Sequence, residues 1–215
     1  MIKQIAVVLV VLTTTGKAIA QFESSKQVYS APSLQTEVVR HKKVAILPFA
    51  ATITYKRLPK KYDEAANKAD EQTSAANMQQ GMFTYLLRKG NNYTVNFQDV
   101  ERTNTLLKQS GVFDKVNEMT MDSICKILGV DAVIKSSYTY QRTASDGGAI
   151  AKGLLLGSAF STTGNGTLTM QIYNGKDGEL LWRFVKEMNE NVMGSGNQVM
   201  ERMMRKVSRN FPYEN

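Results

Sequence analysis

Four cations in one short loop have the clearest capacity for binding chemistry in this sequence. Lys56, Arg57, Lys60 and Lys61 lie within residues 55–62, where they alternate with tyrosine, leucine and proline. The loop follows an apolar strand, and ligands of open α/β sheets usually bind at the carboxyl ends of strands. Clustered cations attract lipid phosphates, anionic glycans or acidic proteins. We therefore predict an interaction site here; the alternative is a solvated loop whose charges only maintain solubility.

Catalytic chemistry finds little support, because the chain has one histidine and one cysteine. His41 lies between Arg40 and Lys42 in a polar stretch, where we expect a solvated side chain without the partners that a catalytic base needs. Cys125 falls on the apolar face of a predicted helix, which favours a buried structural thiol. The sequence predicts no metal site, no cofactor and no enzymatic activity.

A glycine-rich segment, residues 146–166, is the second candidate interaction site and holds six of the fifteen glycines. Gly153 and Gly157 have the four-residue spacing that lets helices approach closely. Leu155 and Phe160 accompany them as apolar contact residues. The apolar part is too short to cross a bilayer as a helix. It is either a flexible connection with a short buried helix or a contact with a membrane surface or a neighbouring subunit.

The amino terminus predicts export. Lys3 precedes a short apolar run, and the small residues Ala18 and Ala20 precede Gln21, which is the pattern of a secretory signal peptide cleaved after residue 20; the alternative is an uncleaved anchor. Because residue 21 is not cysteine, we expect no lipid anchor on an amino-terminal cysteine. We predict a location in the periplasm or at the periplasmic face of the outer membrane, with a flexible arm over residues 21–42.

The remaining chain, residues 43–212, predicts one α/β domain with a mixed sheet of about five strands flanked by helices. Its first strand, KVAILPF, is apolar on both faces and should be central and covered on both sides. Apolar periodicity and turn residues predict the other elements. Helices are expected at 64–89, 99–110, 120–129 and 197–209, and strands at 93–97 and 130–142 and in a hairpin over 167–184.

The order of these elements and several short phrases resemble a known α/β domain. The phrases are VAILPF, DVER leading a helix, ILGVDAVIKSSYTY, and a hairpin carrying DGELLW. Together they resemble the curli secretion channel family, the amino-terminal domain of TolB with its anticodon-binding-like fold, and the lipoproteins that activate penicillin-binding proteins. The resemblance implies an envelope protein that assembles or docks without catalysis.

Two functions remain open at this point. The first is an exported envelope protein that self-associates or docks to envelope proteins, in secretion or envelope biogenesis. The second is a binding module for anionic lipid or peptidoglycan through the basic loop 55–62, with peripheral membrane contact. We do not expect nucleic-acid binding, because the sequence lacks a dense Lys/Arg face.

Overall fold

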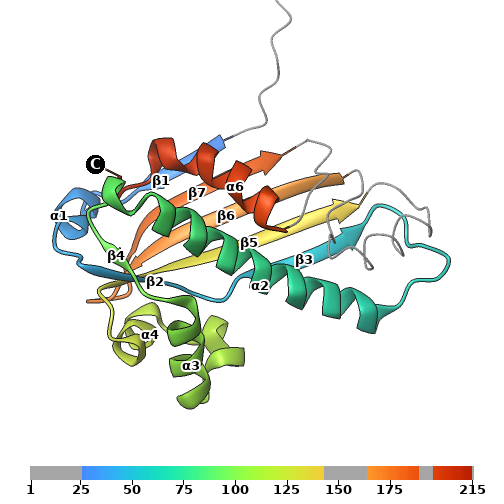
Figure 1. The fold of residues 1–215 in the computed structure, drawn as a ribbon, viewed down its shortest axis with the longest axis horizontal. Coiled ribbons are helices and arrows are strands. Elements are labelled where there is room, and N and C mark those ends of the chain that lie inside the picture. Colours follow the sequence, from blue (N-terminus) through green and yellow to red (C-terminus); the bar gives the residue numbers. More distant parts are fainter. Residues whose placement is uncertain (1–25, 143–163, 189–195, 215) are drawn as a thin grey trace, which may run out of the picture.

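A seven-stranded mixed β-sheet runs through the molecule, with strand order β1-β7-β6-β5-β2-β4 and with β3 also paired to β5 (Figure 1). The structure is a computed structural model that describes residues 26–142, 164–188 and 196–214. The predicted single α/β domain with a mixed sheet flanked by helices is confirmed. The sheet has seven strands in place of the expected five or so, because two short or polar edge strands join it.

The described elements have the following bounds. The strands are β1 Lys26–Ser30, β2 Lys43–Ile46, β3 Ala50–Tyr55, β4 Asn96–Phe97, β5 Ala132–Arg142, β6 Gly164–Asn174 and β7 Leu180–Met188. The α-helices are α1 Leu34–Val38, α2 Glu64–Arg88, α3 Val100–Gln109, α4 Met121–Leu128 and α6 Gly196–Val207. Short 3-10 helices occupy Gly90–Asn92, Phe113–Glu118 and Ser208–Asn210. Each helix and strand predicted within the described residues of the domain has a counterpart, but the strand expected at 93–97 is only Asn96–Phe97 and the one expected at 43–49 is only Lys43–Ile46.

Strand β2 lies inside the sheet, between β5 and the short edge strand β4, and is covered on both faces, as predicted. Val44 and Ile46 belong to the larger core cluster, and Ala45 and Leu47 belong to a smaller cluster on the opposite face. All four side chains are 0% exposed. A near-continuous apolar run is the pattern expected of a strand that contacts packed side chains on each side.

Strand β3 continues β2 along the same edge of β5 after a bulge. Ile46 pairs with Ile134 and Ala50 with Ser137, so the segment from 46 to 50 has one more residue than the segment of β5 opposite it. Pro48 lies in this segment, and its lack of an amide hydrogen suits a position where the ladder is interrupted. Both β2 and β3 run parallel to β5.

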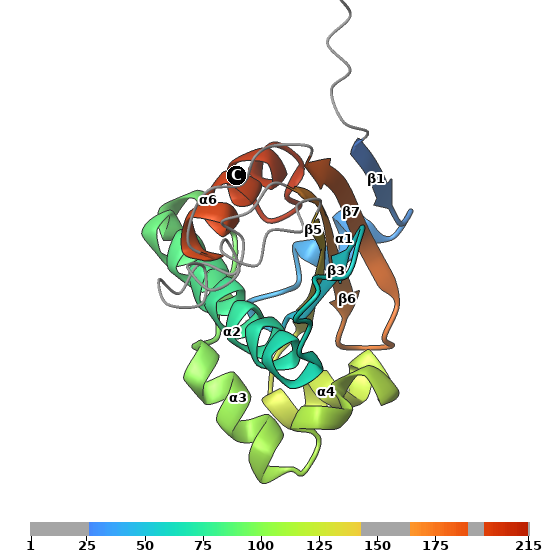
Figure 2. The ribbon, with the colours of Figure 1, turned by 90° about the vertical axis from the view of Figure 1, so that its right-hand side faces the viewer.

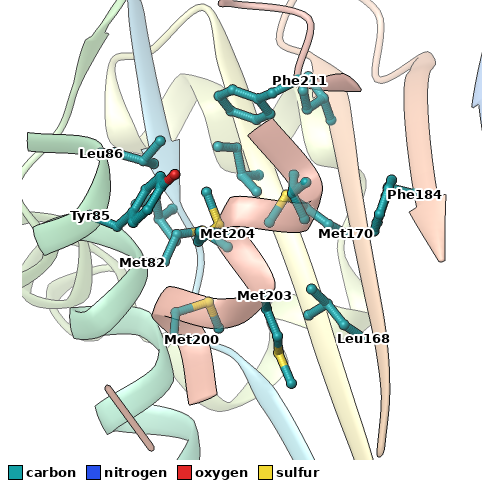
Figure 3. Packing of buried hydrophobic residues seen from close by; sticks show 14 of the residues in the cluster. Met82, Tyr85, Leu86, Leu168, Met170, Phe184, Met200, Met203, Met204 and Phe211 are labelled. Carbon is teal, nitrogen blue, oxygen red and sulfur yellow. The ribbon is translucent and has the colours of Figure 1, made fainter. Parts of the chain in front are cut away.

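Helices α2 and α6 cover one face of the sheet side by side (Figure 2). Their apolar stripes meet β6 and β7 in the larger core cluster, which is rich in methionine (Figure 3). Methionine is unbranched and flexible, so it fills the irregular space between two crossing helices and a twisted sheet. The labelled members of this cluster include Met82, Leu168, Met170, Met200, Met203 and Met204.

Helices α3 and α4 enclose the smaller cluster against the other face of β2 and β5. Thr120 precedes α4, and Gly129 ends it in the left-handed conformation with φ 62°, as predicted from the glycine. Cys125 is 1% exposed in this cluster, and burial raises the pKa of its thiol to about 12. The prediction of a buried structural thiol is confirmed.

The prediction of a flexible arm over residues 21–42 is wrong for its described part. Residues 26–30 form β1, which pairs antiparallel with β7, and Leu34 and Val38 of α1 enter the larger core cluster. All five residues of β1 are exposed, so no apolar alternation distinguishes the strand in the sequence. The pairing with β7, more than 150 residues away along the chain, holds it in place.

His41 is also not the solvated residue that we predicted, because α1 and the carboxyl-terminal segment enclose it. Its side chain is 4% exposed. Its Nδ1 lies 2.8 Å from the hydroxyl oxygen of Tyr213, and its Nε2 lies 3.3 Å from Oδ1 of Asn174. Desolvation by burial lowers the pKa of His41, opposed by the hydrogen bond with Asn174 and by the charges of Asp131 and Glu37.

Burial of His41 predicts that the protein loses stability as the pH falls below about 6.5. The unfolded chain binds a proton near the ordinary histidine pKa, whereas the folded chain resists it until a lower pH. Stability is therefore fully present above 6.5 and declines by up to about 1.4 kcal/mol per pH unit as the pH drops toward the folded-state pKa. Urea unfolding at pH 7.5 and 5.5 measures this slope.

The variant His41→Gln serves as the control because His41 is the single histidine of the chain. The variant should be less stable at pH 7.5 but should show a flatter pH dependence between 7.5 and 5.5. Equal slopes in the two proteins would contradict the role given to His41.

Candidate functional site

A stripe of four cations runs along one face of helix α6 and into the 3-10 helix Ser208–Asn210 that follows it. Arg202, Arg205, Lys206 and Arg209 follow the spacing i, i+3, i+4 and i+7, which aligns side chains along one side of an α-helix. The stripe adjoins the apolar face that α6 packs on the sheet, where Val199, Met203 and Val207 are at most 1% exposed. Packing of the helix therefore fixes where the cations lie.

Two more cations come from the sheet beside this stripe. Lys26 of β1 lies directly opposite Lys186 of β7 in the antiparallel ladder. Like charges in opposed positions destabilise a strand pair. Lys186 is 3% exposed, and the Lys26 ammonium group lies 3.4 Å from Oδ1 of Asn210.

Together these residues line a cleft of about 420 Å³ between α6 and the β1–β7 pair. Six of its eight described lining residues are lysine or arginine, and none of the eight is acidic. We call this site the cationic cleft; its described lining residues are Lys26, Phe184, Lys186, Arg202, Arg205, Lys206, Arg209 and Asn210.

Glu201, on the adjoining side of α6, forms ion pairs with two arginines. It lies 2.7 Å from Arg205 and 3.1 Å from Arg88 at the carboxyl end of α2. The hydrogen bonds from Arg205 and from Arg88 lower the pKa of the Glu201 carboxyl, and the hydrogen bond to Glu201 raises the pKa of Arg205. These exposed contacts connect α2 to α6 but neutralise only part of the charge of the stripe.

Arg202 contributes a partly buried guanidinium group to the cleft. Its Nε and Nη2 atoms are buried and have no hydrogen-bond partner among the described residues. A buried charged donor without an acceptor is costly, and guanidinium groups are usually paired with carboxylate or phosphate oxygens when they leave water. The described lining of the cationic cleft therefore suits an anion.

The basic loop predicted as an interaction site lies elsewhere in the molecule. Lys56, Arg57, Lys60 and Lys61 are all exposed in the connection between β3 and the amino end of α2 (Figure 1). No ion pair joins any of them to another residue in the described part of the chain. None of the four lines the cationic cleft.

At the start of this connection Arg142, which is 3% exposed, holds the loop against β5. Its Nη1 donates to the Tyr55 hydroxyl at 3.0 Å, and its Nη2 lies 3.5 Å from Asp70. Its backbone carbonyl also accepts from the Lys56 amide at 2.9 Å. The first residue of the basic loop is therefore fixed to the sheet.

The other predicted interaction residues, Gly153, Leu155, Gly157 and Phe160, lie outside the described residues. In the described part of the chain, no group of three His, Cys, Asp or Glu side chains is arranged to hold a metal ion. None of the described helices combines the length and the apolar character needed to cross a membrane.

The sequence contained a signal for half of the cationic cleft. The i, i+3, i+4, i+7 spacing of cations in the last helix can be read from the sequence, whereas apolar periodicity identifies only the buried face of that helix. Lys26 and Lys186 join the stripe through the β1–β7 pairing, and β1 was expected to be part of a flexible arm. No local pattern connects residues that far apart.

Comparisons with known proteins give structural likenesses only. No family model matches this chain, and no curated protein matches it. Among solved structures, lipoprotein GNA1162 from Neisseria meningitidis has a TM-score of 0.47 at 12% identity, covering 78% of this chain and 96% of that one. The PelC dodecamer from Paraburkholderia phytofirmans has a TM-score of 0.40 at 10% identity, covering 89% and 99%.

The C-terminal domain of LpoB from Salmonella enterica has a TM-score of 0.35 at 12% identity, covering 73% of this chain and 96% of that one. The similar structures thus include a penicillin-binding-protein activator lipoprotein, one of the groups that the sequence resembles. The resemblances to the curli secretion channel and to TolB stay predictions. Because all three TM-scores are below 0.5, these likenesses say nothing about what this chain binds.

Proposed function

We propose that this protein is a non-catalytic, exported cell-envelope protein that docks to an anionic envelope component through the cationic cleft. The observation that carries the proposal is the composition of the cleft, where six cations and no carboxylate occur among the eight described lining residues. A concave surface lined by charges of one sign concentrates oppositely charged partners. The predicted signal peptide supports an envelope location.

A second candidate function places the same kind of docking at the basic loop 55–62, with anionic lipid or peptidoglycan as ligand. The exposure of Lys56, Arg57, Lys60 and Lys61 favours it. The cleft is the better site because its cations surround a concave volume. A solvated loop loses more conformational entropy when it becomes ordered around a ligand.

Retention on immobilised heparin, a polyanion, tests which surface binds anions. The variant Lys26→Glu/Arg209→Glu reverses two exposed cations of the cleft. Each Lys or Arg near an anionic surface contributes about 1 kcal/mol, so the loss of two should weaken binding roughly 30-fold or more. The salt concentration needed for elution should fall accordingly.

The matched control is Lys60→Glu/Lys61→Glu, which changes the net charge of the protein by the same amount at the loop. We expect retention close to that of the wild type. An equal loss in both variants would mean that only net charge matters, and a loss confined to the control would place the site at the loop.

A further inference from the structure

An exposed apolar side chain adjoins the cationic cleft. Val28 of β1 is 42% exposed and lies directly opposite Phe184, which lines the cleft. Lys26 is two residues away in the same strand, so it points to the same face of the sheet as Val28. Cations and apolar surface therefore lie next to each other at this edge of the molecule.

The cleft has no aromatic ring available for stacking among its described lining residues. Its one aromatic side chain, Phe184, is 0% exposed and stacks on Trp182 with ring centroids 5.8 Å apart. Proteins that bind single-stranded nucleic acids combine cations with exposed rings on which bases stack. This site instead combines cations with an exposed aliphatic side chain. Such a combination complements a phospholipid surface, where anionic headgroups adjoin apolar acyl chains.

We propose that the cationic cleft binds the phosphate group of an anionic phospholipid, so that the edge formed by β1 and α6 lies against a membrane surface. The proposal rests on the cleft being the docking site put forward above. The unpartnered guanidinium atoms of Arg202 call for an oxyanion beside them, and phosphate oxygens match guanidinium geometry. A cleft of about 420 Å³ has the size of a site for one headgroup.

In this arrangement Lys26, Arg205 and Arg209 contact neighbouring headgroups at the rim of the cleft. Val28 reaches the boundary between the headgroups and the acyl chains. Binding is peripheral and reversible, because one valine buries little apolar surface.

Sedimentation with vesicles tests the proposal. The full chain is mixed with vesicles of phosphatidylcholine alone, with vesicles that also contain phosphatidylglycerol, and with vesicles that contain diacylglycerol succinate, whose charge is a carboxylate. We expect binding to phosphatidylglycerol vesicles at least about tenfold tighter than to the carboxylate vesicles, the difference expected of one charge-assisted contact.

Three variants report on the named contacts. Arg202→Gln should weaken binding to phosphatidylglycerol vesicles about tenfold, and Val28→Ser should weaken it roughly fivefold. Lys26→Gln, at an exposed position where folding is not at risk, keeps the test decisive if Arg202→Gln does not fold. The control Lys60→Gln in the basic loop should bind like the wild type.

The outcomes separate this proposal from the proposed function. Two results would contradict the phospholipid proposal but not the proposed docking site. One is equal binding to carboxylate vesicles and to phosphatidylglycerol vesicles. The other is no binding to any vesicle while the difference between the two variants on heparin persists. Binding of glycerol phosphate in solution without any binding to phosphatidylglycerol vesicles would assign the cleft to soluble phosphate esters, and tighter binding to an oligonucleotide would assign it to nucleic acid. Either result overturns the membrane proposal. Loss of the heparin difference itself would overturn both.

Discussion

Trp182→Ala lowers the free energy of unfolding by about 3–5 kcal/mol, the range for removing a fully buried large aromatic side chain. Trp182 is 1% exposed on β7. Its ring stacks on the Phe184 ring and makes a T-shaped contact with the Phe211 ring, with 6.0 Å between the ring centroids of Trp182 and Phe211. The variant leaves a cavity at the point where the sheet, the end of α6 and the carboxyl-terminal segment meet, and close-packed surroundings cannot collapse to fill it.

Urea unfolding followed by circular dichroism measures this loss. Fluorescence is unsuitable, because Trp182 is the single tryptophan of the chain. Leu58→Ala is the control, since Leu58 is 67% exposed and its truncation should change stability by less than about 0.5 kcal/mol. A loss below about 1 kcal/mol in Trp182→Ala would mean that this core is loosely packed.

Gly175→Ala should cost about 1–3 kcal/mol, as expected of overpacking at a site that cannot move. A β-carbon at position 175 would lie 2.6 Å from the carbonyl oxygen of Asp131 and 2.9 Å from Cβ of Cys125. The Asp131 backbone cannot easily move away from this β-carbon, because the Asp131 side chain accepts hydrogen bonds from the amides of Lys42 and Lys43 at 2.7 and 2.9 Å.

Gly90→Ala provides the matched control for this substitution. A β-carbon there would meet nothing within 4 Å, and the residue does not need a positive φ. Its stability should equal or slightly exceed that of the wild type. Thermal unfolding of the two variants side by side distinguishes a steric clash from a general effect of replacing glycine, and similar melting temperatures would argue against the clash.

Local sequence patterns predicted most of the fold because each element carried its own signal. The apolar run at 43–49, the stripe of α2 and the turn at 174–178 each depend on residues close together in the chain. The helix predicted at 99–110 begins at Asp99, whose carboxylate accepts from the Arg102 amide at 3.0 Å. Edge strand β1 was missed because an exposed polar strand is defined by its partner and not by its own residues.

The candidate site was predicted less well for the same physical reason. The charge density of one consecutive stretch predicted an interaction site at Lys56, Arg57, Lys60 and Lys61. The cationic cleft instead gathers residues from β1, β7, α6 and the 3-10 helix after α6, so its charge density exists only after folding. Burial of His41 was missed likewise, because Tyr213 and Asn174 reach it from 172 and 133 residues away.

The extra residue between β2 and β3 inverts which positions of this edge face the helices. Before it, even-numbered Val44 and Ile46 join the core under α2; after it, odd-numbered Phe49 and Ile53 are buried while Thr52 and Thr54 are exposed. A one-residue deletion there would restore regular alternation and exchange the two sets, exposing isoleucine and burying threonine. This segment should therefore tolerate substitutions far better than any change in its length.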